Sequence, residues 1–238
     1  MWFTHTSAEA NPDANAPRLL FLHGGLSDTR ALQGMMSELA GPHELWAYDR
    51  RAHGRTPDTE EPLGFDSMLT EAVAIIVDLI RSPVHVVGHS DGASLALLLA
   101  SLRPDLVLSV AAFSGNLDPS GMMPGELTVD ELVNAVKDDY AAISPDSIDH
   151  LPVLADKIIT LWFSEPAMTT AGVAAIRCPV LIAAPDNDSI REEHTRTIHA
   201  AIPGARLAIV PDATHMMVED KPAVCAGLVR DLLRSAGA

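Results

Sequence analysis

VHVVGHSDGASLALLLASL, residues 84–102, begins as a short apolar run and continues as an apolar helical segment. Between the two lies GHSDG, residues 88–92, which fits the pattern G-x-S-x-G. A sharp strand-to-helix turn of this kind needs small residues at its outer positions and exposes the serine hydroxyl. The pattern therefore predicts a turn that presents Ser90 as a nucleophile at the end of a strand.

Apolar runs with the length of buried strands recur along the rest of the chain. They lie at Arg18–Leu22, Glu44–Tyr48, Leu106–Phe113, Val180–Ala184 and Arg206–Val210. Helical patterns separate them, at Asp28–Ala40, Met68–Ile80, Ala93–Leu102 and Arg191–Ala201, with a last helix around Val224, Leu228 and Leu232. This alternation predicts an α/β fold with a mostly parallel sheet covered by helices on both faces. The residues before Arg18 have room for one short edge strand, Trp2–Thr6, which gives six to seven strands.

One segment breaks the alternation, because residues 116–176 contain no strand pattern. Thr128–Glu131 fits a capping box, in which a threonine and a glutamate three residues later satisfy each other's backbone amides. We expect a helical insertion here that forms a small lid. The core domain then consists of residues 1–115 and 177–238.

The predicted strand ends carry the residues that a serine nucleophile requires. A serine hydroxyl needs a base, and the base needs a group that orients it. His215 follows the last strand, and Asp186 and Asp188 follow the preceding one. The two aspartates alone supply too few carboxylates for a cation site, so no metal is predicted. Asp91 is a poor alternative nucleophile, since a turn centred on it would begin at a histidine rather than a glycine.

Several motifs together resemble the α/β-hydrolase superfamily. They are LHGG (22–25), YDRRAHGR (48–55), GHSDG (88–92), APDNDSI (184–190) and PDATH (211–215). The chain looks most similar to small serine hydrolases of the biphenyl-hydrolase-like or valacyclovirase-like kind. The resemblance implies that Asp188, the second acid of its loop, orients the histidine, with Asp186 as the alternative. Pro185 stands where this family often has glycine.

The resemblance also implies a reaction. Ser90, His215 and Asp188 would cleave a small or medium carboxylic ester or lactone through an acyl-enzyme, without a cofactor. The backbone amides of Asp91 and Gly25, or Leu26 in place of Gly25, would bind the oxyanion. Leu26, Met122, Trp162 and Met216 are candidates for the substrate pocket, and packing within the lid is at least as good an interpretation of Met122, Trp162 and Met216. The same residues could serve a C–C bond hydrolase, an amidase or a perhydrolase, or a ligand receptor or regulatory protein with little turnover.

Composition limits the partners of the chain. Its 238 residues include 16 Lys and Arg against 32 Asp and Glu, a formal charge of −16. Such a surface repels nucleic acids and acidic membranes, so neither is expected to bind. Met1–Pro17 lacks the features of a signal peptide, and Cys178 and Cys225 form no Cys-x-x-Cys pair, which favours a cytoplasmic protein with reduced cysteines. The few residues before Arg18 predict a shortened sheet edge, which a second copy of the chain could pair with. The sequence is therefore compatible with a monomer or a homodimer.

Overall fold

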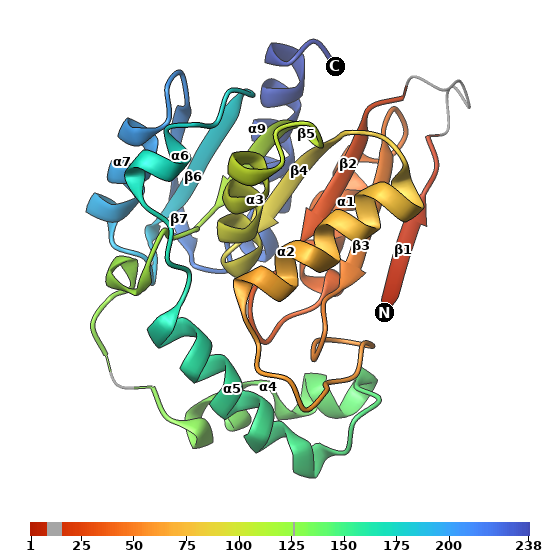
Figure 1. Cartoon of the computed structure of the whole chain (residues 1–238), viewed down its shortest axis with the longest axis vertical. Helices are drawn as coiled ribbons and strands as arrows, with labels where there is room; N and C mark the ends of the chain where they lie inside the picture. The colour runs from red at the N-terminus through yellow and green to blue at the C-terminus, as the bar shows by residue number, and fades with distance from the viewer. Residues whose placement is uncertain (9–15, 126) are drawn as a thin grey trace.

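The computed structural model describes residues 1–8, 16–125 and 127–238, and these form a seven-stranded sheet between layers of helices (Figure 1). The strands are β1 (Trp2–Thr6), β2 (Arg18–Leu22), β3 (Glu44–Asp49), β4 (Val84–His89), β5 (Val107–Phe113), β6 (Val180–Asn187) and β7 (Arg206–Thr214). Their order is β1-β3-β2-β4-β5-β6-β7, with β1 antiparallel to β3 and every other pairing parallel. The predicted fold class, the upper end of the predicted strand range and the edge strand β1 are confirmed.

The helices are α1 (Gln33–Leu39), α2 (Phe65–Ala74), α3 (Asp91–Leu102), α4 (Val129–Ile143), α5 (Leu151–Ser164), α6 (Thr170–Val173), α7 (Glu192–Ala201), α8 (Met217–Asp220) and α9 (Pro222–Ser235). The helix predicted over Asp28–Ala40 differs in its first turn. Asp28 is extended and its carboxylate accepts the amide of Arg30, so the segment starts as a 3₁₀ turn, Thr29–Leu32. A carboxylate at this position satisfies an amide that has no partner within the helix.

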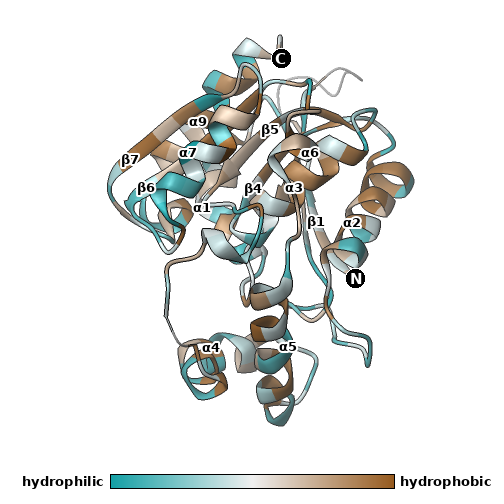
Figure 2. Cartoon of the chain, turned by 60° about the vertical axis from the view of Figure 1, so that its left-hand side comes forward, coloured by the Kyte–Doolittle hydropathy of each residue, from teal (hydrophilic) through white to brown (hydrophobic). Residues whose placement is uncertain are grey.

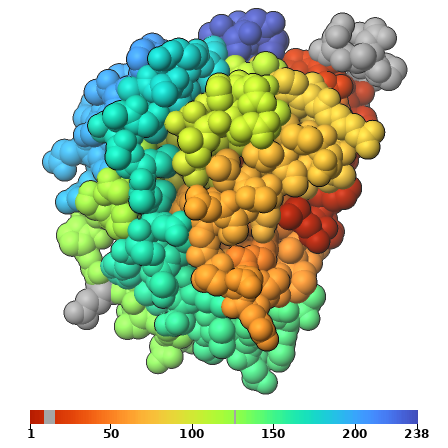
Figure 3. All heavy atoms as spheres, in the orientation of Figure 1, coloured from red at the N-terminus to blue at the C-terminus, as the bar shows by residue number. Residues whose placement is uncertain are grey.

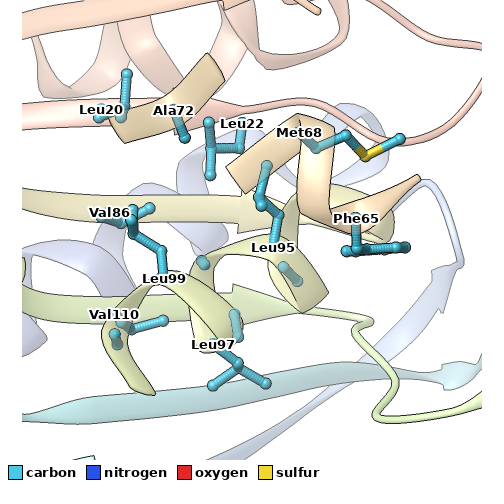
Figure 4. Packing of buried hydrophobic residues seen from close by; sticks show 14 of the residues in the cluster. Leu20, Leu22, Phe65, Met68, Ala72, Val86, Leu95, Leu97, Leu99 and Val110 are labelled. Carbon is cyan, nitrogen blue, oxygen red and sulfur yellow. The ribbon is translucent and has the colours of Figure 1, made fainter. Parts of the chain in front are cut away.

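Alternate side chains of each central strand enter different cores, as expected for a period of two. Leu20 and Leu22 of β2 pack in a cluster that also includes residues of α2 and α3 (Figure 4). Leu19 and Phe21 point to the opposite face, in a cluster with residues of α1 and α9. In Figure 2 the ribbon is mainly brown, the hydrophobic colour, along β7 and α3, and carries both colours along α4 and α5. The sheet is therefore a rigid support, buried on both sides, for the residues at its strand ends.

Strands β6 and β7 are longer than the apolar runs that predict them. Both continue into polar residues, because pairing resumes beyond a register shift at Pro185 and joins Asn187 to Thr214. Backbone pairing does not require apolar side chains, so hydropathy alone could not locate these ends. The residues that follow the last pair are Asp188 and His215, and the extended pairing holds them side by side.

Helices α4 and α5 lie together at one end of the sheet, apart from the helices on its faces (Figure 1). The capping box predicted at the start of α4 is present, with the Thr128 amide donating to the Glu131 carboxylate at 2.9 Å. In Figure 3 the orange segment after β3 lies against the green helices. Asp58 of that segment is buried and accepts hydrogen bonds from Lys157 at 2.7 Å and His150 at 2.9 Å. These contacts fasten α5 and the turn before it to the core.

Candidate active site

Ser90 occupies the sharp turn between β4 and α3. Its φ of 54° and ψ of −120° are a conformation that a residue with a side chain rarely adopts. The flanking glycines are required by close backbone approaches: a Cβ on Gly88 would collide with the carbonyl of Gly92, and one on Gly92 with the carbonyl of Leu22. The sequence pattern thus follows from sterics, and the turn projects Ser90 at the start of α3.

Three side chains from three strand ends form one hydrogen-bonded chain. His215 Nε2 lies 3.0 Å from Ser90 Oγ, and His215 Nδ1 lies 2.6 Å from Asp188 Oδ1. The carboxylate of Asp188 is 5% exposed, so its pairing with the imidazole is shielded from water. This geometry lets Nδ1–H donate to Asp188 while Nε2 accepts the serine proton.

The structure separates the two candidate acids. Asp186 is exposed and accepts the backbone amides of Asp212 at 3.0 Å and Ala213 at 3.3 Å. These two amides hold the pKa of Asp186 below its usual range. Its carboxylate braces the loop before His215, whereas Asp188 contacts the imidazole. Of the two acids, Asp188 is therefore the one that lies beside the imidazole, and its catalytic role stays a prediction.

His89 supports the same loop from the other side, a contact that sequence reasoning missed. Its Nε2–H donates to the main-chain carbonyl of His215 at 2.7 Å, and the two rings lie 5.1 Å apart. Burial, followed by the neighbouring His215, lowers the pKa of His89 to about 4. The ring is therefore a neutral donor at physiological pH. Its place beside Ser90 was the only signal in the sequence, and it does not reveal a partner 126 residues away.

A second unpredicted arrangement fixes the glycine turn after β2. The carbonyl of Gly24 accepts hydrogen bonds from Arg50 Nη2 at 2.8 Å and from His23 Nδ1 at 2.7 Å. Because a trans peptide group is planar, these donors also fix the opposite direction of the Gly25 N–H. Arg50 is 1% exposed. A buried guanidinium thus sets the orientation of one predicted oxyanion donor.

The other predicted oxyanion donor, Asp91, is the first residue of α3, where backbone amides have no helical partner. Its side chain is buried, and both carboxylate oxygens lie 3.1 Å from Nε1 of Trp162 in α5. Burial raises the pKa of Asp91, and the nearby Arg50 and the indole N–H oppose that rise. A Cβ on Gly25 would lie 2.5 Å from Asp91 Oδ2 and 2.7 Å from Trp162 Cζ2, so glycine is needed there.

Two cavities meet at Ser90. One, of about 320 Å³, is lined by Met122 and Trp162 among others, and a larger one of about 460 Å³ is lined by Leu26, Trp162 and Met216. Ser90 and His215 line both. All four residues predicted for the substrate pocket therefore border the space around Ser90.

Within residues 1–8, 16–125 and 127–238, no three His, Cys, Asp or Glu side chains converge as metal ligands would. No helix of these ranges has the length and apolar character needed to cross a bilayer. Cys178 is half-buried and Cys225 buried, and neither forms a disulfide.

Residues 19–228 match the model of a family described as the alpha/beta hydrolase family. Similar proteins include an sn-1-specific diacylglycerol lipase, ABHD11, of Mus musculus, 29% identical over 158 residues, and the lipase LipV of Mycobacterium tuberculosis, 31% identical over 145 residues. These alignments cover 64% and 61% of this chain but 49% and 51% of the relatives, so the chain matches about half of each. The enol-lactonase of Burkholderia xenovorans has the same fold, with a TM-score of 0.77 at 18% identity over 98% of this chain and 96% of that one. The chain belongs to the α/β hydrolase family.

Proposed function

We propose that this protein is a serine hydrolase that cleaves a small or medium carboxylic ester or lactone through an acyl-enzyme. The observation that carries the proposal is the hydrogen-bonded chain from Ser90 through His215 to Asp188. Relatives named as lipases support an ester as the substrate class.

In the first half of the proposed reaction, His215 Nε2 takes the proton of Ser90 as Oγ bonds to the carbonyl carbon. The amides of Asp91 and Gly25 receive the negative oxygen, and the positive end of α3 adds to their effect. The intermediate then collapses. Its leaving alkoxide takes the proton from Nε2 and departs as an alcohol.

In the second half, water gives a proton to His215 and bonds to the acyl carbon. The new intermediate expels Ser90 Oγ, which regains its proton from Nε2, and the carboxylic acid leaves. Asp188 stabilises the imidazolium in both halves without taking its proton. In this proposal residues 116–176 serve as the lid, and no cofactor takes part.

Other properties of the chain extend the proposal. Its formal charge of −16 supports a small-molecule substrate rather than a nucleic acid. The unpaired Cys178 and Cys225 support a reducing, cytoplasmic location. A monomer and a homodimer are both compatible with the proposed reaction.

The test combines a fluorophosphonate probe, mass spectrometry and a panel of p-nitrophenyl esters, with Ser90→Ala as the matched control. We expect the probe on Ser90, ester turnover in the wild type, and neither in the variant. Far-ultraviolet circular dichroism checks that the variant is folded. Labelling without turnover of any ester or lactone would favour a hydrolase-fold receptor instead. A variant with wild-type turnover would refute the assignment of Ser90.

A further inference from the structure

Three residues line both of the cavities at Ser90, namely Ser90, His215 and Trp162, so Trp162 is the one shared wall outside the Ser90–His215 pair. An ester carbonyl on Ser90 has two substituents, the acyl chain and the leaving group. With a wall between the cavities, the two substituents extend to opposite sides of it. The position of Trp162 therefore bears on which substrates fit.

The indole is held on three sides. Its N–H donates to both oxygens of the buried Asp91 carboxylate, at 3.1 Å each. Its Cζ2 edge lies so close to Gly25 that a single Cβ there would be 2.7 Å away. The helix that carries it, α5, is fastened to the core through Lys157 and Asp58. A wall fixed in this way sets a boundary that a substrate must accommodate.

The smaller cavity is lined mainly by apolar side chains, with Asp91, Asn116 and Glu165 among its polar residues. Met122, Met123, Leu127, Phe163 and Ile190 line it beside the indole. Met123 and Phe163 are each 55% exposed, so part of this apolar lining is open to solvent. Its volume of about 320 Å³ equals that of about ten water molecules. This space suits a hydrocarbon chain of up to about ten non-hydrogen atoms.

The larger cavity has a different character. Asp28, Arg30, Asp139 and Glu219 line it together with Leu26 and Met216. Arg30 is paired with Asp28 at 2.9 Å. Charged side chains stay hydrated, because removing their water costs free energy. This cavity is therefore the less favourable place for a hydrocarbon chain.

We propose that Trp162, held by Asp91, is the specificity-determining wall of the site: a linear, medium-length acyl chain enters the apolar cavity, and a polar leaving group occupies the charged one. This inference rests on the proposed function and names its substrate class. Each methylene that enters the apolar cavity should raise kcat/KM about fourfold, until the chain exceeds the cavity.

The experiment measures kcat/KM for p-nitrophenyl esters from acetate to dodecanoate. In the wild type we expect a rise and then a sharp fall at about eight to ten carbons. Leu127→Trp, which fills the apolar cavity, should lower the octanoate-to-acetate ratio about tenfold or more. Val136→Trp, in the wall of the charged cavity, is the matched control and should leave that ratio unchanged. Trp162→Ala joins the cavities and should abolish the fall at long chains.

Each outcome has a defined meaning. A length profile unaffected by Leu127→Trp, or one shortened by Val136→Trp instead, would overturn the proposal. If Trp162→Ala fails to fold, the Leu127 and Val136 variants decide the question alone. If the wild type takes up the fluorophosphonate on Ser90 but hydrolyses none of the esters, the proposed function fails together with this inference. If it hydrolyses the esters without a length limit, only the inference fails.

Discussion

The neutral, buried His89 should make the stability of this protein depend on pH in a way that one substitution can reveal. Its Nε2–H holds the carbonyl of His215, while its Nδ1 is buried with no hydrogen-bond partner among the described residues. Protonation would place a second N–H, and a charge, in that unpartnered position. Burial, and to a smaller extent the neighbouring His215, lower the pKa of His89 in the folded state to about 4, against 6.5 for an unperturbed histidine.

The sign follows from proton binding. Below pH 6.5 the unfolded chain takes up a proton on His89 that the folded chain refuses until about pH 4. The folded state therefore has its full stability above pH 6.5 and loses it as the pH falls toward 4. At 1.36 kcal/mol for each pKa unit, the loss from this one side chain is about 3 kcal/mol. That is a large part of the 5–15 kcal/mol typical of a folded domain.

His89→Gln keeps an N–H donor for the carbonyl of His215 and cannot titrate. Urea unfolding of both proteins, followed by tryptophan fluorescence between pH 8 and 4.5, gives the free energy of unfolding at each pH. The stability of the variant relative to the wild type should be constant above pH 7.5 and should rise by about 3 kcal/mol by pH 4.5. Contributions from other titrating groups cancel in this difference. A difference that stays flat across the whole range would refute the reasoning.

Three further predictions follow from the site and its support. Asp188→Asn should lower kcat for p-nitrophenyl acetate about 10³- to 10⁴-fold with little change in KM, since the amide disfavours the productive tautomer of His215. Arg50→Met should lower kcat about tenfold or more and leave KM unchanged, with partial recovery in Arg50→Lys, because the guanidinium orients an oxyanion amide rather than binding substrate. Gly92→Ala should abolish soluble expression, whereas Gly227→Ala, in α9 with open space around it, should raise the free energy of unfolding by about 0.5–1 kcal/mol.

Much of the architecture could be predicted because it depends on local pattern. The G-x-S-x-G turn follows from backbone sterics, and the alternation of short apolar runs with helices specifies a parallel sheet. The lengths of β6 and β7 could not be predicted in the same way. Their last pair joins two polar residues, Asn187 and Thr214, through the backbone, and no periodicity marks it. The extension nevertheless decides which aspartate reaches His215.

Contacts between segments that are far apart in the sequence could not be predicted either. A spacing pattern cannot show that His89 reaches the carbonyl of His215, or that Arg50 reaches that of Gly24, because neither pair shares an element. The same holds for Trp162, which the sequence offers equally as packing within the lid. In the structure its N–H meets the Asp91 carboxylate. Asp91 therefore has two proposed roles, with its backbone amide directed at the oxyanion and its side chain holding the lid.

These two roles of Asp91 make conflicting electrostatic demands. A carboxylate beside the position where negative charge develops would disfavour that charge, unless a positive group or protonation offsets it. Two features of the structure act in that direction, since burial raises the pKa of Asp91 and Arg50 lies near enough to oppose its charge. The hydrogen bond from the indole N–H stabilises the negative charge that remains on the Asp91 carboxylate. The same buried Arg50 that fixes the Gly25 amide thus also allows an acid next to Ser90. It links the orientation of the proposed oxyanion turn to the contact that holds α5 in place.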